Sequence, residues 1–161
     1  MLPAPVYYAI LLLCAAYVAA RGGAPERVGA AIMVVGSVCT TVLLSARPVR
    51  YSEVETGAVI VDVAVCAAFL VLALRANRYW PLWMTALQLI GTAEHAVKMV
   101  DSHVIRLVYA FIMAIWAYPM LMLLVLGAWQ HQRRLARFGV DRSWSSSSAR
   151  SVPGQRAPRT G

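Results

Sequence analysis

Ionisable side chains interrupt two otherwise apolar stretches of this sequence. Asp62 stands between Val-Ile-Val and Val-Ala-Val, and a second stretch contains Glu94, His95 and Lys98. Carboxylate, imidazole and amine groups in apolar surroundings could bind an ion, transfer a proton or neutralise one another, because an unpaired buried charge is costly. Glu94 and Lys98 are four residues apart, the spacing at which side chains on one face of a helix meet.

Five apolar segments are expected to position these side chains. They cover residues 5–20, 28–46, 56–74, 79–100 and 104–129. They reach or nearly reach the roughly 20 residues that a helix needs to cross a bilayer, and none alternates with the period of a strand. The sequence therefore predicts an all-α fold, a polytopic transmembrane helix bundle of five spans. Four spans are the alternative, if the fourth segment enters and leaves the membrane on one side.

The composition excludes an ordinary soluble domain. Hydrophobic residues make up 60% of the 161 residues and charged residues 14%, and the mean hydropathy is +0.64. Soluble domains have roughly 45–50% apolar and about 25% charged residues. The net charge of +8 also shows that the charged residues are mainly basic.

The distribution of basic residues predicts the orientation. The C-terminal segment is the most basic part of the chain; its arginines are Arg133, Arg134, Arg137, Arg142, Arg150, Arg156 and Arg159. Because Lys and Arg favour the cytoplasmic side of a membrane, we expect a cytoplasmic C-terminus and, with five spans, an N-terminus outside. Aromatic residues that anchor at headgroup level support the same boundary: Tyr79, Trp80, Trp83 and Trp129.

The chain divides into a bundle, residues 1–138, and a tail, residues 139–161. The tail is rich in Ser, Arg and Pro, so it has little to bury and is expected to be disordered. The last helix should continue past the membrane to Phe138, where Arg133, Arg134 and Arg137 are expected to contact anionic lipid headgroups. A nucleic-acid partner is not expected, because the tail has no folded basic face.

A candidate site follows from the depths of the polar residues. Asp62 lies six residues into the third segment, about 9 Å deep at the helical rise, and Glu94 lies six residues before the end of the fourth. Pairing the second and third segments about a turn near Tyr51 places Thr40 or Thr41 opposite Asp62. We therefore expect a shared cavity in the outer half of the bundle, formed by Asp62, Thr40, Glu94, His95 and Lys98.

Three interpretations of this cluster remain open. The first is structural, with Glu94 and Lys98 neutralising each other. The second is a binding or proton-handling site that opens to the outside. The third is a metal or haem site, but its ligands would be His95, His103, Glu94 and Asp101, which match no recognised spacing. No metal and no cofactor are therefore expected, and His131 belongs to the opposite membrane face.

The functional prediction is a non-enzymatic membrane protein, because no nucleophile, metal-protease or phosphate-binding motif occurs. It would be an accessory subunit that binds other membrane subunits, or a small independent bundle. A small transporter or proton- or ion-handling protein is one alternative. A phage-type membrane-permeabilising protein is another.

One part of the sequence resembles a known set of proteins. Its motifs are Arg78-Tyr79-Trp80-Pro81-Leu82-Trp83, then Gln88 and Glu94-His95, and later Trp116-Ala117-Tyr118-Pro119-Met120. Over roughly residues 55–130 the chain resembles small bacterial inner-membrane proteins without assigned function. The resemblance implies a bacterial cytoplasmic membrane and adds no activity, substrate or functional residue.

Overall fold

The computed structural model describes residues 4–45, 56–100, 115–139, 141 and 144, with the backbone alone for residues 4, 44, 45, 56 and 95–100. Its elements there are all helices: α1 Ala4–Arg21, α2 Ala24–Ser45, α3 Thr56–Arg75, α4 Trp80–Val100 and α6 Ala117–Phe138. The all-α prediction is confirmed for these residues. The start of the fifth expected segment, residues 104–114, and most of the tail lie outside the described residues.

The helix ends follow from local sequence. Pro25 and Pro81 are the second residues of α2 and α4, where the missing amide proton removes no helical hydrogen bond. Gly22 follows α1 in a tight turn, and a Cβ there would lie 2.6 Å from the carbonyl oxygen of Val18. Gly139 closes α6 with φ 70° and donates its N–H to the carbonyl of Leu135 at 2.9 Å.

The last helix differs from expectation at its start. The fifth segment is expected over residues 104–129, which would put Pro119 in the interior of a span, but α6 begins at Ala117. Pro119 is therefore in its first turn, where a proline fits without breaking the helix. The other end agrees with the prediction, because α6 continues past Trp129 to Phe138.

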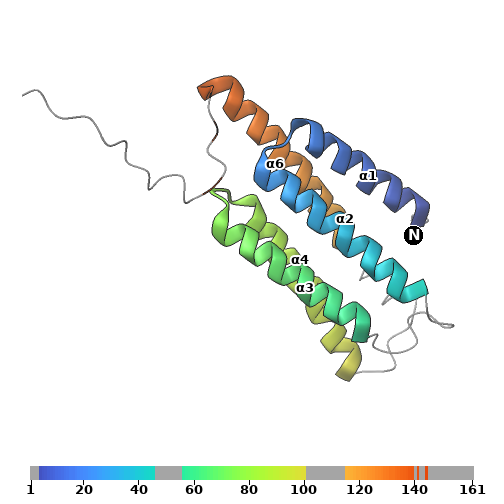
Figure 1. Cartoon of the computed structure of the whole chain (residues 1–161). Coiled ribbons are helices and arrows are strands. Elements are labelled where there is room, and N and C mark those ends of the chain that lie inside the picture. The colour runs from blue at the N-terminus through green and yellow to red at the C-terminus, as the bar shows by residue number, and fades with distance from the viewer. Residues whose placement is uncertain (1–3, 46–55, 101–114, 140, 142–143, 145–161) are drawn as a thin grey trace, which may run out of the picture.

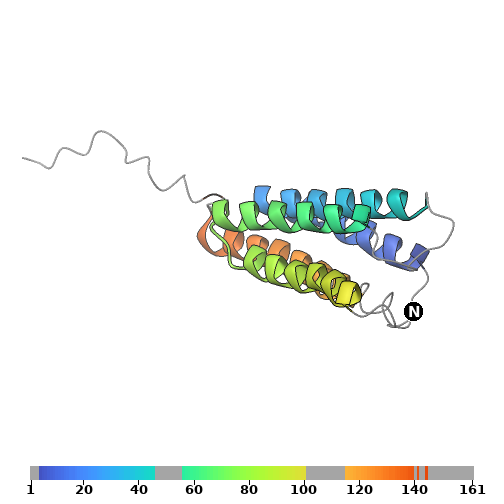
Figure 2. The ribbon, with the colours of Figure 1, turned by 90° about the horizontal axis from the view of Figure 1, so that it is seen from below.

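The helices form a closed bundle. Neighbours along the chain pack against each other from α1 to α4, and α6 packs against α1, α2 and α4. Figure 2 shows α2 and α3 in one layer and α4 and α6 in the other. One end of the bundle holds the α1–α2 connection, residues 22–23, the α3–α4 connection, residues 76–79, and the C-terminal end of α6 (Figure 1). We call this the turn end.

Apolar side chains fill the interior and also cover the outside. The core includes Leu11, Val18, Met33, Phe69, Leu72, Met84, Met120, Leu121 and Leu124. Each helix also exposes large apolar side chains, among them Leu13 (72%), Val42 (63%), Ile60 (64%), Leu89 (60%) and Met122 (60%). A soluble monomer rarely exposes such continuous apolar surface.

Two of the described helices are long and apolar enough to cross a membrane by length and composition. They are α2, over Ala24–Leu43, and α3, over Gly57–Arg75, while the apolar stretch of α1 is shorter. α4 carries Glu94, His95 and Lys98 of the predicted site, and α6 ends in a polar segment that contains His131, Arg133 and Arg134. The two long apolar helices are weak evidence of a membrane protein.

Candidate functional site

The structure gives Asp62 and Glu94 partners on neighbouring elements. Gln88 of α4 donates from Nε2 to Asp62 Oδ1 at 3.4 Å, which links α3 to α4. Trp116, just before α6, donates its indole N–H to Glu94 Oε1. Gln88 and Trp116 thus join the polar groups in the half of the bundle away from the turn end, and neither was predicted as a partner.

The other predicted site residues lie on the expected helices. Thr40 is a half-buried residue of α2. The hydroxyl of its neighbour Thr41 contacts the Tyr8 hydroxyl and donates to the Ser37 carbonyl at 2.9 Å, which ties α2 to α1. His95 and Lys98 are in the last turns of α4, and their side chains lie outside the described residues. A shared cavity of these residues with Asp62 therefore stays a prediction.

A second polar group, missed by the sequence analysis, lies at the turn end. Its centre is Glu26 in the first turn of α2, which is fully buried. Trp80 donates its indole N–H to Glu26 Oε1 at 3.2 Å, and Arg78 Nε lies 3.8 Å from the same oxygen. The first turn of α2 is therefore tied to the α3–α4 connection.

Asp141, just after α6, completes this group. Arg78 Nη2 lies 2.5 Å from Asp141 Oδ2, and Arg134 Nε donates to Oδ1 at 3.1 Å. His131 Nδ1 contacts Oδ2. One guanidinium, that of Arg78, thus bridges two carboxylates that come from opposite ends of the sequence. We call the set the turn-end cluster, whose residues are Glu26, Arg78, Trp80, His131, Arg134 and Asp141.

The turn-end cluster is buried and its charges balance. The side chains of Glu26, Asp141 and Arg78 are 0%, 4% and 8% exposed. Two arginines face two carboxylates, which is needed because a buried charge without a partner is strongly destabilising. At Gly23 a Cβ would lie 2.9 Å from both Glu26 Oε2 and His131 Cε1. These two side chains therefore meet over the glycine backbone.

The surroundings of Asp141 keep it ionised. Burial by itself would raise the pKa of this carboxyl, but the hydrogen bond with His131 and the positive charges of Arg78 and Arg134 outweigh burial and lower the pKa from its ordinary value. A carboxyl with a lowered folded-state pKa contributes stability above its unfolded-state value and loses it as the pH falls through the folded-state value. The ion pairs of Asp141 therefore persist at neutral pH.

Glycines bring the helices close around Trp80, whose indole holds Glu26. Gly29 of α2 and Gly127 of α6 both face the ring: a Cβ would lie 2.7 Å from Trp80 Cη2 at Gly29 and 3.1 Å from Trp80 Nε1 at Gly127. Small residues at helix contacts let backbones approach closely. Gly29 and Gly127 therefore make room for a large buried side chain between α2 and α6.

The sequence did contain a signal for the turn-end cluster. In the predicted topology Glu26, Arg78, His131 and Asp141 all fall at the cytoplasmic boundary. Basic residues there were used to assign orientation, while the acidic residues between them were not considered as partners. Opposite charges at one boundary would have indicated pairing.

Within the described residues, no three His, Cys, Asp or Glu side chains are grouped to hold a metal ion. Comparison with protein-family models, with curated proteins and with solved structures found no match to this chain.

Proposed function

We propose that this chain is a five-span integral protein of a bacterial cytoplasmic membrane, with its N-terminus outside and its C-terminus in the cytoplasm. It acts as a non-enzymatic accessory subunit, a helical bundle that binds other membrane subunits through its apolar faces. The exposed apolar side chains on every described helix support this membrane location. In this orientation the turn end faces the cytoplasm.

Basic and aromatic side chains at the turn end suit a cytoplasmic membrane surface. Its exposed arginines are Arg21, Arg27, Arg75, Arg133 and Arg137. The Arg133 guanidinium lies 4.1 Å from the ring centre of Trp129, a cation–π pair of the kind that forms at headgroup level. Arg133 and Arg137 are thus available to anionic headgroups, whereas Arg134 is engaged by Asp141.

An apolar layer lies between the turn-end cluster and the Asp62–Gln88 pair. This layer favours an accessory subunit over a transporter. Met84 and Phe69 are fully buried between the turn-end cluster and the Asp62–Gln88 pair, and Leu121 and Leu124 of α6 are buried in the same core. A transporter needs polar groups along the path of its substrate. Met84 and Phe69 instead form a buried apolar layer, which separates the Asp62–Gln88 pair from the turn-end cluster.

Cross-linking from the exposed faces tests this proposal. We would place a photo-reactive amino acid in cells at Leu13, Ile60 or Leu89, which face outward on different helices. We expect a discrete adduct with another membrane protein from one of these positions, and none from the buried control position Leu124. Purified protein in liposomes should not increase proton flux reported by an enclosed pH-sensitive dye.

The alternatives predict other results. An absence of adducts together with proton flux above that of empty liposomes would overturn the proposal in favour of an ion-handling protein. Leakage of an enclosed fluorescent dye, with lethality on expression, would instead overturn it in favour of a membrane-permeabilising protein.

A further inference from the structure

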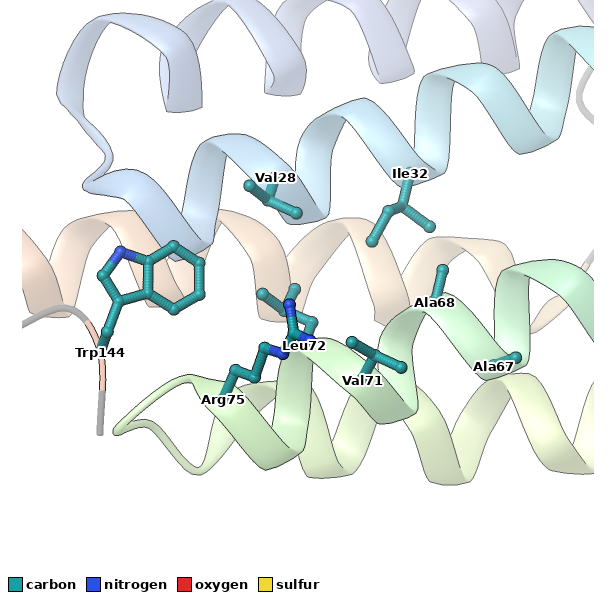
Figure 3. Close-up of a pocket in the computed structure, with 8 residues that line it drawn as sticks. All are labelled: Val28, Ile32, Ala67, Ala68, Val71, Leu72, Arg75 and Trp144. Carbon is teal, nitrogen blue, oxygen red and sulfur yellow. The ribbon is translucent and has the colours of Figure 1, made fainter. Parts of the chain in front are cut away.

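A groove runs along the outside of the bundle between α2 and α3, the two helices apolar enough to cross a membrane. Its walls are Val28, Ile32, Ala67, Ala68, Val71 and Leu72, and its volume of about 510 Å³ is within the roughly 300–1,000 Å³ of small-molecule sites. Figure 3 shows Arg75 and Trp144 at one end of the groove and Ala67 at the other. The small side chains of Ala67 and Ala68 leave the groove open at the end away from Arg75 (Figure 3).

The end of the groove next to Arg75 is basic and aromatic. Arg75 is the last residue of α3 and is exposed, and Trp144 pairs with Ala76 in an isolated antiparallel bridge. Trp144 also packs against core side chains, so its ring is held at the end of the groove. Tryptophan and arginine are the side chains that favour the headgroup level of a membrane.

The charges at this end complement an anion. Among the described residues, the carboxylates at the turn end are Glu26 and Asp141, and both are buried within the turn-end cluster. The side chains of Arg75 and of Arg27, the neighbour of Val28, are exposed near the groove. An anion at the mouth of the groove therefore meets positive charge, and the two described carboxylates of the turn end are buried away from it.

The length of the groove fits one leaflet. Ala67 and Arg75 are eight residues apart on α3, which is about 12 Å along the helix at 1.5 Å per residue. One leaflet contributes half of a hydrocarbon core that is roughly 30 Å thick. A lipid acyl chain that entered beside Arg75 would thus reach Ala67 near the middle of the bilayer.

We propose that this groove is a binding site for one anionic phospholipid of the cytoplasmic leaflet. One acyl chain lies between α2 and α3 against Ala67 and Ala68, and the phosphate lies beside Arg75 and the Trp144 ring. This inference rests on the proposed membrane location, and it names a lipid partner for one surface of the bundle.

Native mass spectrometry of the full-length chain in mild detergent tests the site. With added dioleoylphosphatidylglycerol we expect one retained lipid per chain, and less retention of dioleoylphosphatidylcholine, which has the same acyl chains and no net charge. Arg75→Gln should weaken phosphatidylglycerol binding about fivefold, because a basic residue at a membrane surface contributes about 1 kcal/mol and 1.4 kcal/mol is tenfold. Arg21→Gln, at the same end and outside the groove, should bind as the wild type does.

Further variants separate the acyl chain from the headgroup. Ala68→Leu fills the groove and should reduce retention of both lipids, and Trp144→Ala, outside the helices, tests the same site if Ala68→Leu does not fold. Glycerol phosphate alone should not be retained. Equal phosphatidylglycerol retention by wild type, Arg75→Gln and Trp144→Ala would overturn the lipid site while leaving the membrane location intact. Recovery of the wild-type chain outside the membrane fraction would contradict both.

Discussion

Replacement of Arg78 by methionine is expected to destabilise the bundle by about 3–5 kcal/mol, the usual effect of removing one partner from a buried ion pair. Arg78 lies 3.8 Å from Glu26 and 2.5 Å from Asp141, and all three side chains are buried. Methionine keeps the length of the side chain and leaves both carboxylates without their shared cation. The loss should therefore come from charge and not from volume.

Unfolding in mild detergent, followed by circular dichroism, measures this effect. Arg21→Met is the matched control, since Arg21 is exposed at the same end of the bundle and surface charges contribute about 0–1 kcal/mol. The difference in the free energy of unfolding between wild type and Arg78→Met should narrow as the pH falls through the lowered pKa of Asp141, because the protonated carboxyl no longer needs a cation. Equal stabilities of Arg78→Met and Arg21→Met at neutral pH would show that the turn-end cluster does not stabilise the fold.

The second large effect on the stability of the bundle is expected from Gly29→Ala. A Gly→Ala change inside a helix usually stabilises it by roughly 0.5–1 kcal/mol. At Gly29, however, the new Cβ would lie 2.7 Å from Trp80 Cη2, and the ring cannot move freely because Glu26 and Gly127 hold it. Overpacking of this kind costs about 1–3 kcal/mol, so Gly29→Ala should be destabilising.

Gly57 offers the matched control for this change. A Cβ at Gly57 would lie 3.5 Å from Leu43 Cδ1, which is ordinary van der Waals contact with the end of an exposed side chain. Gly57→Ala should therefore be neutral or stabilising in the same denaturation experiment. If Gly29→Ala also raised the free energy of unfolding, close packing of α2 against Trp80 would be wrong.

The sequence was sufficient to locate α3 and α4. The third segment was expected at residues 56–74 and α3 is Thr56–Arg75; the fourth was expected at 79–100 and α4 is Trp80–Val100. Apolar runs that end at arginine, glycine or proline define such bounds by composition alone. The start of α6 at Ala117 was not predicted, because Pro119 fits the first turn of a helix as well as a kink within one.

The partners of polar residues were harder to predict. Spacing along one helix shows which residues share a face, but not how neighbouring helices are rotated about their axes. The sequence predicts Thr40 or Thr41 as a partner of Asp62 and did not predict the hydrogen bond that Gln88 donates to it.

The turn-end cluster needed contacts between residues far apart in sequence. Asp141 and Trp144 also fall in the stretch expected to be disordered, yet they contact the bundle. The ion pairs of Asp141 and the packing of the half-buried Trp144 against the core offset the entropy of ordering these residues.

Reporter fusions at the two ends of the chain test the central claim, a five-span membrane bundle, most directly. A phosphatase that is active only outside the cytoplasm and a fluorescent protein that matures only inside it would each be fused to either terminus. We predict phosphatase activity only at the N-terminus and fluorescence only at the C-terminus. Fluorescence at both termini, without phosphatase activity at either, would contradict five spans and support the four-span alternative.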